Sequence, residues 1–319
     1  MEVAFKKLSY VVLMLLIISV ISFLAINIAP NSFLSGGELN PNMSKEAIEN
    51  LKAIYGLDKS LPQQYLNWLK NIITLNFGIS FVSGANVSEE ILKRVPITLT
   101  MNFISLVFVF VISLYLGIKS ALNYEKKSDY IIRQLSLFSF SMPSFYLALL
   151  LLILFSLKLG ITPISGLHSN IPKEGLAYYS DMAWHLVLPI GVMVLVGFGS
   201  LSIYIRSLTL EILKSDYYYF AISRGLGQNK LLRYYILPNL LPPIVTLLGL
   251  SLPALIGGSV ILESIFGIDG MGQLFFLSAM SRDYPIIMGI LIITAFLTLL
   301  GNIVADLVLL KLNPFAART

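Results

Sequence analysis

The sequence contains no cysteine and few charged residues for its length. Without cysteine there is no disulfide framework and no thiolate metal site, so any extracytoplasmic loop must be held by packing, and redox chemistry is not favoured. Charged residues make up 12% of the chain, whereas soluble globular domains carry about 25%. Hydrophobic residues make up 56%, and the mean hydropathy is +0.82. This composition predicts an integral membrane protein.

Several functional motifs are also missing. The sequence has no G-x-x-x-x-G-K-[ST] loop to cradle a nucleotide phosphate, and its two histidines, His168 and His185, form no H-E-x-x-H pair. Both histidines are expected to be structural rather than metal ligands. The stretch GFGSL at 197–201 is weakly similar to an intramembrane serine protease, but a Gly-Ser pair in a helix more often serves close packing. We predict no catalytic residue, no metal site and no cofactor in this chain.

Six apolar runs dominate what the sequence does contain. A membrane-spanning helix needs about 20 mostly apolar residues, and runs of that kind lie at about 8–29, 98–118, 131–157, 184–205, 240–262 and 286–310. The first run is too long for the apolar part of a secretory signal and is predicted to remain as a helix. Long unbroken runs lack the alternation of a transmembrane barrel. The fold class is therefore predicted as all-α, with six transmembrane helices.

Lysine and arginine predict the orientation of these helices. Segments 1–8, 119–133, 206–233 and 311–319 carry 13 Lys and Arg residues in 60 positions, and the intervening segments 30–97, 158–183 and 264–284 carry 9 in 115. Basic residues collect on the cytoplasmic side of membrane proteins. Both termini are therefore expected in the cytoplasm. The net charge of +5 and pI near 9.2 come from residues spread over loops, which does not favour a nucleic-acid partner.

The division of the chain follows from these segments. We predict a first region of residues 1–97, with one membrane helix and an extracytoplasmic amphipathic part, a core of 98–310, and a cytoplasmic tail of 311–319. In the first region, Ser44 is a candidate cap for a helix ending at Gly56, and Pro62 is placed to start a second. The second helix has Tyr65, Leu66, Trp68, Leu69, Ile72 and Ile73 on one side. A packed cap is favoured over a substrate site.

A few polar residues and prolines fall within the apolar runs. Asp306 and Asn302 lie in the last run, and Glu263 and Asn102 lie near the outer ends of theirs. Such residues are costly in a membrane, and for Asp306 a structural ion pair is favoured over substrate contact. Two further positions, Pro143 and Pro253, are placed to kink helices. None of these fixes a transport pathway.

The cytoplasmic loop 206–239 contains the most informative segment, SDYYYFAISRGLGQNKLLRYYILP at 215–238. Ser215 is a candidate N-cap, about two helical turns follow to Arg224, and Gly225 and Gly227 are candidates for the positive φ that ends a helix. A second helix is predicted from about Gln228 to Leu237, stopped by Pro238. Tyr217, Tyr218, Tyr219 and Phe220 are expected to offer aromatic surface, which favours either an interface with a partner or an amphipathic loop lying on lipid headgroups. Physics alone leaves both open.

This segment resembles the cytoplasmic "EAA" loop of permease subunits of binding-protein-dependent ABC importers. Ala221 and Gly225 stand at that motif's final alanine and its glycine, and Leu237 and Pro238 stand at its closing Leu-Pro. In this family the loop forms a coupling helix, which docks in a groove of a separate cytoplasmic ATPase.

The segment also departs from the usual motif, because Tyr219 and Phe220 replace the Glu-Ala that the family often has. Two neighbouring stretches, Asp216-Tyr217 and Arg224-Gly225-Leu226, are closer to the peptide-permease branch. The resemblance implies an ATPase-coupling site made of ten residues, which are Asp216, Tyr217, Tyr219, Phe220, Ala221, Arg224, Gly225, Leu226, Leu237 and Pro238.

The resemblance extends along essentially the whole chain, to the first of the two permeases in dipeptide, oligopeptide and nickel importers. The family's Asp-Pro-Arg close is replaced by Asn313-Pro314 and a later Arg318. The pieces that match in order are YGLDKSLPQQYLNW, NFGIS, RVPITLT, SMPSFYLALLL, ITPISG, HLVLP, ESIFGIDGMG and RDYPI.

The resemblance also implies the partners and the substrate class. They are a second, similar permease, two ATPase subunits that bind ATP-Mg, and an extracytoplasmic substrate-binding protein, all at the lipid bilayer of a bacterial or archaeal cytoplasmic (inner) membrane. The implied cargo is a di- or oligopeptide, with nickel chelates or oligosaccharides as alternatives. A channel or secondary transporter would need a midplane ionisable network or an inverted repeat, and the sequence shows neither.

Overall fold

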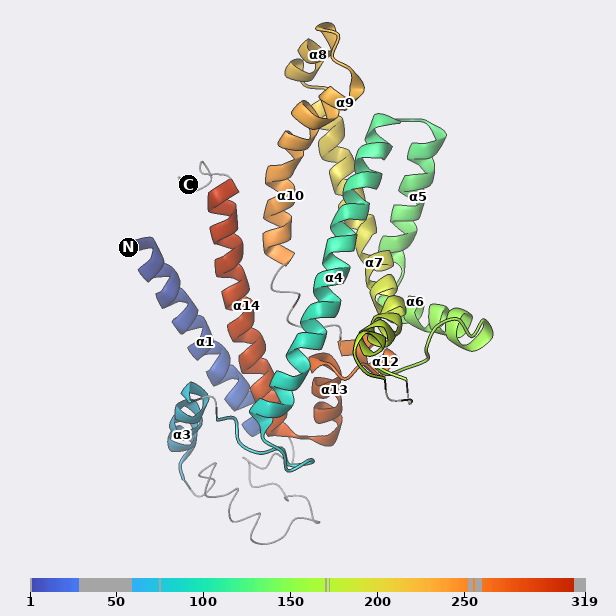
Figure 1. The fold of residues 1–319 in the computed structure, drawn as a ribbon. Coiled ribbons are helices and arrows are strands. Elements are labelled where there is room, and N and C mark those ends of the chain that lie inside the picture. Colours follow the sequence, from blue (N-terminus) through green and yellow to red (C-terminus); the bar gives the residue numbers. More distant parts are fainter. Residues whose placement is uncertain are drawn as a thin grey trace. The chain divides into compact units, whose positions relative to one another are not determined.

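The computed structural model describes residues 2–28, 59–74, 76–169, 171, 173–251, 255 and 260–312. Over these residues the named elements are all helical (Figure 1). They are α1 (Glu2–Ile28), α3 (Leu61–Ile73), α4 (Val87–Leu122), α5 (Lys127–Ser141), α6 (Ser144–Leu151), η2 (Leu152–Lys158), α7 (Leu176–Leu213), α8 (Asp216–Ser223), α9 (Gln228–Leu231), η3 (Leu232–Ile236), α10 (Leu237–Ser251), α12 (Val260–Phe266), α13 (Met271–Ser281) and α14 (Tyr284–Leu312).

The membrane character of the fold is confirmed, with changes in individual helices. Four stretches are long and apolar enough to cross a membrane: Val87–Leu122, Leu176–Leu213, Gln228–Ser251 and Tyr284–Val304. Two bent helix pairs raise the number to as many as six within the described residues. In α1, the described apolar part is the shorter stretch Val12–Leu24.

The third predicted run, 131–157, is not one straight helix. The chain bends by 103° between α5 and the continuous helix formed by α6 and η2. Pro143 stands at the N-cap of α6, where its missing N–H and fixed φ end one helix and start the next. The kink predicted at this proline is confirmed as a break.

The segment 264–284 was predicted only as an outer connection between two membrane helices. It contains α13, which is bent by 89° from α12. Gly267, at φ +59, lies at this bend. The helix predicted around Ser44 and the kink at Pro253 lie outside the described residues, as does the side chain of Asp306.

The chain divides into two compact units. Unit 1 comprises Met1–Thr98, Ile256–Val260 and Asp269–Ile303, and unit 2 comprises Leu99–Leu255, Ile261–Ile268 and Val304–Thr319. Unit 1 therefore combines the N-terminal part of the chain with residues 269–303, whereas most of unit 2 comes from one continuous stretch.

In unit 1, aromatic side chains join α1 to α3. The ring of Phe23 lies 5.5 Å from that of Tyr65 and 5.7 Å from that of Trp68. The hydroxyl groups of Ser19 and Tyr65 are 2.8 Å apart and hydrogen-bonded. Trp68 is buried as expected for the predicted face of α3, but Leu66 and Ile73 are 61% and 77% exposed, so the buried face is narrower than predicted.

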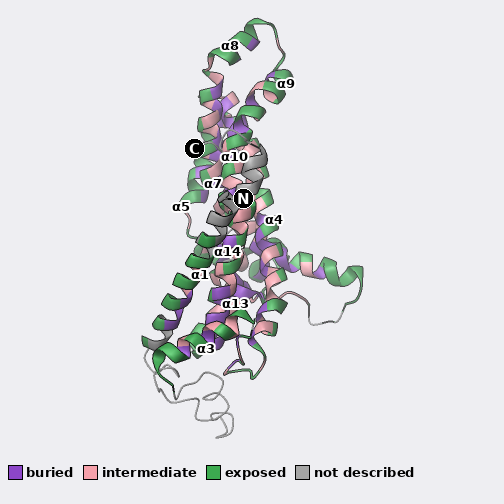
Figure 2. Cartoon of the chain, turned by 90° about the vertical axis from the view of Figure 1, so that its left-hand side faces the viewer, coloured by how far each residue is buried: buried purple, intermediate pink, exposed green. Residues whose placement is uncertain are grey.

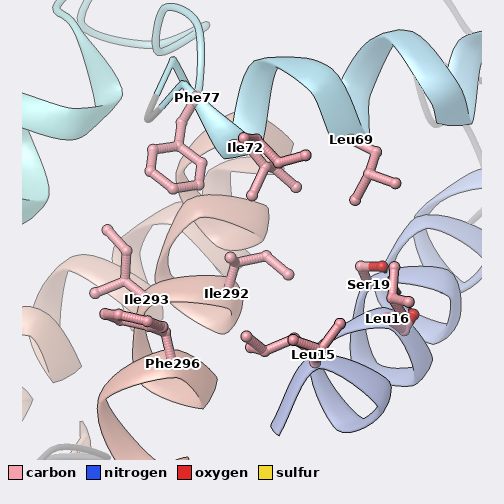
Figure 3. Close-up of a pocket in the computed structure, with 11 residues that line it drawn as sticks. Leu15, Leu16, Ser19, Leu69, Ile72, Phe77, Ile292, Ile293 and Phe296 are labelled. Carbon is pink, nitrogen blue, oxygen red and sulfur yellow. Dashed lines mark hydrogen bonds between the residues drawn. The ribbon is translucent and has the colours of Figure 1, made fainter. Parts of the chain in front are cut away.

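An apolar groove of about 480 Å³ lies in unit 1 between α1, α3 and α14. Figure 3 shows Leu15 and Leu16 from α1, Leu69 from α3 and Phe296 from α14 around it. The packed-cap interpretation of α3 is consistent with this arrangement, because α3 covers hydrophobic side chains from the first and last helices.

Polar contacts connect distant parts of the sequence within unit 1. Ser80 donates a hydrogen bond of 2.5 Å to the carboxylate of Asp283, which also accepts one from the backbone N–H of Phe81. The Nε of Arg94 lies 2.5 Å from the Oδ1 of Asp269, forming an ion pair. Its neighbour by one helical turn, Thr98, accepts a hydrogen bond from the N–H of Met271. These contacts hold the starts of α13 and α14 against the segment 80–98.

In unit 2, glycines let α7 pack closely between α4 and α5. A side chain at Gly197 would meet Val109 of α4, and one at Gly199 would meet the Ser136 carbonyl and the Ser139 side chain of α5. On α4, Gly117 faces Ile205 of α7 in the same way. The close-packing interpretation of the GFGSL stretch is confirmed.

The other polar residues singled out in the sequence lie mainly in unit 2. Asn102 donates a hydrogen bond of 3.0 Å to the carbonyl of Leu255, and Glu263 is completely buried. His185 is buried, with its Nδ1 2.8 Å from the carbonyl oxygen of Asp181. His168 stacks on Tyr178, with ring centroids 4.2 Å apart. Asn302, by contrast, is an exposed residue in unit 1.

Candidate functional site

The predicted coupling segment 215–238 folds as a short helix, a glycine turn and a second helical stretch. Figure 1 shows α8 and α9 at the end of unit 2 where α7 and α10 come together. Helix α8 spans Asp216–Ser223, so the two predicted turns are confirmed. Asp216 lies in the first turn, where a carboxylate interacts favourably with the helix dipole.

Ser215 occupies the N-cap position but does not cap with its side chain. Its backbone is extended, at φ −80° and ψ 149°. Its hydroxyl donates instead to the carbonyl of Ile212, at 2.6 Å. The last carbonyls of a helix lack intrahelical donors, so this hydroxyl serves the end of α7. The predicted side-chain cap is wrong, and the predicted helix start is right.

Gly225 ends α8, as predicted. Its φ is +74°, a conformation that residues with a Cβ rarely adopt. The N–H of Gly225 donates to Ile222 at 2.8 Å, and the N–H of Leu226 donates to Ala221 at 3.4 Å. This pair of bonds, with a hydrophobic contact after the glycine, is the Schellman motif. The turn therefore has a defined geometry.

Gly227 does not share that role, because its φ is −68° and it forms the N-cap of α9. The second helix begins at Gln228, as predicted. It does not stop at Pro238, however, and continues through α10 to Ser251. A π-helical stretch, η3, precedes the proline.

The π-helical turn explains how the helix passes Pro238. The N–H of Leu237 bonds to the carbonyl of Leu232, five residues earlier. The amide of Asn239 donates at 2.6 Å to the carbonyl of Tyr235. Wider turns and side-chain donors of this kind satisfy backbone groups around a proline in membrane helices.

One face of the coupling segment is anchored in unit 2. Tyr218 is 7% exposed and Ala221 is completely buried. They pack with Ile118 of α4, Ile205 of α7 and Ile236 of η3 in one hydrophobic cluster. Burial raises the pKa of the Tyr218 phenol above its ordinary value. Leu226 and Leu237 are half-buried against the same cluster.

The opposite face of the coupling segment is exposed (Figure 2). Tyr217 is 43% exposed, Tyr219 59% and Phe220 62%. The guanidinium of Arg224 lies 5.8 Å from the ring centroid of Phe220, within cation–π range. The ten candidate residues thus divide by exposure: Asp216, Tyr217, Tyr219, Phe220, Arg224, Gly225 and Pro238 are exposed, Leu226 and Leu237 are intermediate, and Ala221 is buried.

Sequence reasoning misplaced one residue of this segment and missed another. Tyr218 was expected to add to the aromatic surface, but it is buried and anchors the loop, whereas Ile222 adds an unforeseen exposed apolar side chain, at 47%, to the outer face. The spacing of Tyr218 and Ala221 could have identified the anchored side, because residues three apart lie on one helix face. The arrangement presents rigidly held aromatic side chains outward, as interface anchors require.

Two family descriptions match the chain over almost its whole length. Residues 110–318 match the inner membrane component of binding-protein-dependent transport systems, and residues 2–102 match the N-terminal part of that component. The solved structure titled as inward-facing conformations of the MetNI methionine ABC transporter has a TM-score of 0.56 and 18% identity, covering 70% of this chain and 96% of that one. That likeness supports the fold.

Three named relatives are similar to this chain over most of its length. The oligopeptide transport system permease protein AppB of Bacillus subtilis is 35% identical, over 94% of this chain and 94% of its own. The di/tripeptide permease DppB of Pseudomonas aeruginosa is 32% identical over 86% and 85%, and the nickel import permease NikB of Staphylococcus aureus is 31% identical over 97% and 89%. This chain therefore belongs to the family of inner membrane components of binding-protein-dependent transport systems.

Proposed function

We propose that this chain is a pathway-forming permease subunit of an ATP-driven importer of di- or oligopeptides. The observation that carries the proposal is 35% identity, along 94% of the chain, to an oligopeptide transport permease. A second relative with 32% identity is named for di- and tripeptides. The pathway would form between this chain and a second, similar permease.

In this proposal the exposed face of α8 is the coupling surface. We define the coupling surface as Tyr217, Tyr219 and Phe220 of α8 together with Arg224 at its C-cap, all of which are exposed. It would dock on one of two cytoplasmic ATPase subunits, and these would bind ATP-Mg. The Lys and Arg distribution supports a cytoplasmic position for the coupling segment and for both termini.

The inner anchor of α8 would carry ATPase closure into the membrane helices. Tyr218 and Ala221 share one hydrophobic cluster with Ile118 of α4 and Ile205 of α7, and a displacement of α8 would be passed to both helices through this cluster. Rigid-body transmission through packed helices is an established route from ligand-driven closure to alternating access. The proposed core of residues 98–310 contains these helices, with 1–97 as the first helix and extracytoplasmic region and 311–319 as the tail.

Nickel is the second candidate cargo, because a nickel import permease is 31% identical over 97% of this chain. An extracytoplasmic binding protein would deliver either cargo. The two candidates are therefore separated by what the binding protein carries and what enters reconstituted vesicles.

The test is reconstitution of the chain with its second permease, two ATPases and binding protein in proteoliposomes. We expect ATP-dependent uptake of labelled di- or oligopeptides, and no ATP hydrolysis by the chain alone. Uptake of nickel without uptake of peptides would replace the peptide assignment. Robust ATP turnover by the isolated chain, after removal of contaminants, would contradict the proposal that separate subunits hydrolyse ATP.

The coupling surface has its own test in the variant Phe220→Ala. Loss of this exposed ring should reduce copurification of the ATPase, with membrane abundance unchanged. Tyr130→Ala is the matched control, because Tyr130 of α5 is also 62% exposed and lies outside the coupling segment. Equal ATPase recovery for both variants would favour the alternative in which the aromatic residues lie on lipid headgroups.

A further inference from the structure

A buried ion pair lies in unit 2 close to the anchor of the coupling segment. Asp129, in the first turn of α5, is 1% exposed. Arg206 of α7 binds its carboxylate with two parallel hydrogen bonds, of 2.7 and 2.8 Å. The same carboxylate accepts a bond of 2.5 Å from Ser120 of α4 and one of 3.1 Å from the N–H of Glu125. We call Asp129, Arg206 and Ser120 the clamp.

The clamp joins three helices at one point. Ser120 comes from the end of α4, Asp129 from the start of α5 and Arg206 from α7. The turn between α4 and α5 is itself held, because Glu125 adopts φ +61° and the ring of Tyr124 lies 5.4 Å from the Arg206 guanidinium. Figure 1 shows α4 and α5 joined by this short turn.

The energetics favour a geometric role for this pair. Burying two charges costs desolvation energy that their attraction only roughly repays, so a buried ion pair adds little stability over apolar packing. A bidentate guanidinium–carboxylate contact does fix distance and angle. The clamp is therefore better suited to setting the relative position of helices than to strengthening the fold.

The clamp lies beside the cluster that anchors α8. Arg206 directly follows Ile205, and Ser120 is two residues after Ile118. Ile118 and Ile205 belong to the same hydrophobic cluster as Tyr218 and Ala221 of α8. A displacement of α8 thus reaches α4 and α7 through apolar contacts, at the level where the clamp connects both to α5.

We propose that Asp129 is a positioning residue that makes α5 move together with α4 and α7 when the coupling segment moves. The proposal rests on the function proposed above. Without the clamp, the ATPase would still dock on α8 and displace α7, but α5 would follow less faithfully. Less substrate would then cross the membrane for each ATP hydrolysed.

The experiment uses the full importer in proteoliposomes and measures peptide uptake and ATP hydrolysis together. For Asp129→Asn we expect normal ATPase docking, and uptake per ATP lower by at least about fivefold, the low end of coupling between distant sites. Arg206→Lys keeps the charge but loses the bidentate contact, and it should also lower uptake per ATP. Ser207→Ala is the control, because Ser207 is exposed and bonds within its own helix.

Combining substitutions shows whether the two residues act as one device. Because either change breaks the clamp, the double variant Asp129→Asn with Arg206→Lys should be no worse than the more affected single variant. Additive losses would indicate independent roles and contradict the proposal.

A chemical rescue separates positioning from folding. The chain has no cysteine, so Asp129→Cys with Arg206→Cys gives a unique thiol pair. A bifunctional thiol reagent of about the length of the ion pair should restore uptake per ATP by reconnecting α5 to α7, whereas a monofunctional reagent should not. Equal effects of the two reagents would overturn the proposal, and so would loss of all clamp variants from the membrane.

Failure of the clamp proposal and failure of the proposed function give different results. If the protein is not a peptide importer, the unmodified complex shows no ATP-dependent peptide uptake. If only the clamp proposal is wrong, the unmodified complex transports peptide and Asp129→Asn matches it in uptake per ATP.

Discussion

At position 225, the backbone conformation alone explains why glycine is favoured. Its φ of +74° is unfavourable for side chains, while an added Cβ would meet no atom within 4 Å. Any penalty at this position therefore comes from the backbone, at about 1–2 kcal/mol for a residue with a Cβ. Gly227, two residues later, has equally open surroundings but an ordinary φ of −68°.

We predict that Gly225→Val reduces ATPase copurification and uptake together while membrane abundance stays near normal. The strained turn would misdirect α8, whereas the membrane helices would remain folded. Gly227→Val is the matched control and should leave both measurements near the unmodified level. If the two variants behave alike, the turn conformation has no part in coupling.

For the glycines that allow close helix packing, we predict that substitution changes the free energy of unfolding. A side chain at Gly199 of α7 would overlap the backbone of α5, whereas one at Gly191 of the same helix would meet nothing within 4 Å. Gly199→Ala should lower the free energy of unfolding by about 1–3 kcal/mol, a usual range for overpacking. Gly191→Ala should be neutral. Thermal unfolding of the two purified variants measures the difference, and equal midpoints would rule out the close contact.

At the scale of helices, the sequence predicted which segments form membrane helices better than it predicted where those helices break or continue. The apolar runs correctly indicated membrane helices, because hydrophobicity over about 20 residues is a property of composition. The break at Pro143 was also foreseeable, because proline has a fixed φ and no N–H. At Pro238 the same reasoning failed, since the η3 turn and the amide of Asn239 accommodate the proline.

In the candidate site, too, local sequence predicted the elements but not the contacts between them. The segment, its short helix and the Gly225 turn could be predicted from the local sequence. The spacing of Tyr218 and Ala221 places them on one helix face, but the local sequence does not show that this face is buried, because the cluster that holds them includes Ile118 of α4, 100 positions before Tyr218. The clamp at Asp129 was likewise hidden, since nothing in the sequence pairs it with Arg206, 77 positions later.

The start of α14 offers a prediction at this scale. Asp283 directly precedes the helix and is buried, and Ser80 both donates to its carboxylate and accepts bonds from the N–H groups of Val82 and Ser83. Ser80→Ala should lower the free energy of unfolding by about 1–3 kcal/mol, because a buried acceptor loses a donor. Ser83→Ala, at an exposed position, should change it by less than about 0.5 kcal/mol. Chemical unfolding that does not distinguish these variants would contradict the contact.

For the molecule as a whole, orientation in the membrane is the main expectation left to measurement. The Lys and Arg distribution predicts that Lys126 is cytoplasmic and Glu174 is extracytoplasmic. Both residues are exposed within unit 2. Because the chain has no cysteine, Glu174→Cys should react with an impermeant thiol reagent added outside intact cells, and Lys126→Cys should react only after the membrane is opened. The reverse pattern would invert the whole topology.

The discontinuous composition of unit 1 has a consequence for biosynthesis. Most of unit 2 is made from residues 99–255 in one stretch, but unit 1 needs residues 269–303 to join residues 1–98. Ser80 and Asp283 are separated by 203 positions, which a ribosome covers in about 10–40 s at 5–20 residues per second. During that interval the turn at Ser80 has no Asp283 to bind, while residues 99–255 of unit 2 are being made. We therefore expect residues 99–255 of unit 2 to pack first during synthesis. The segment 80–98 would pack later, once α13 and α14 have been made and can contact it.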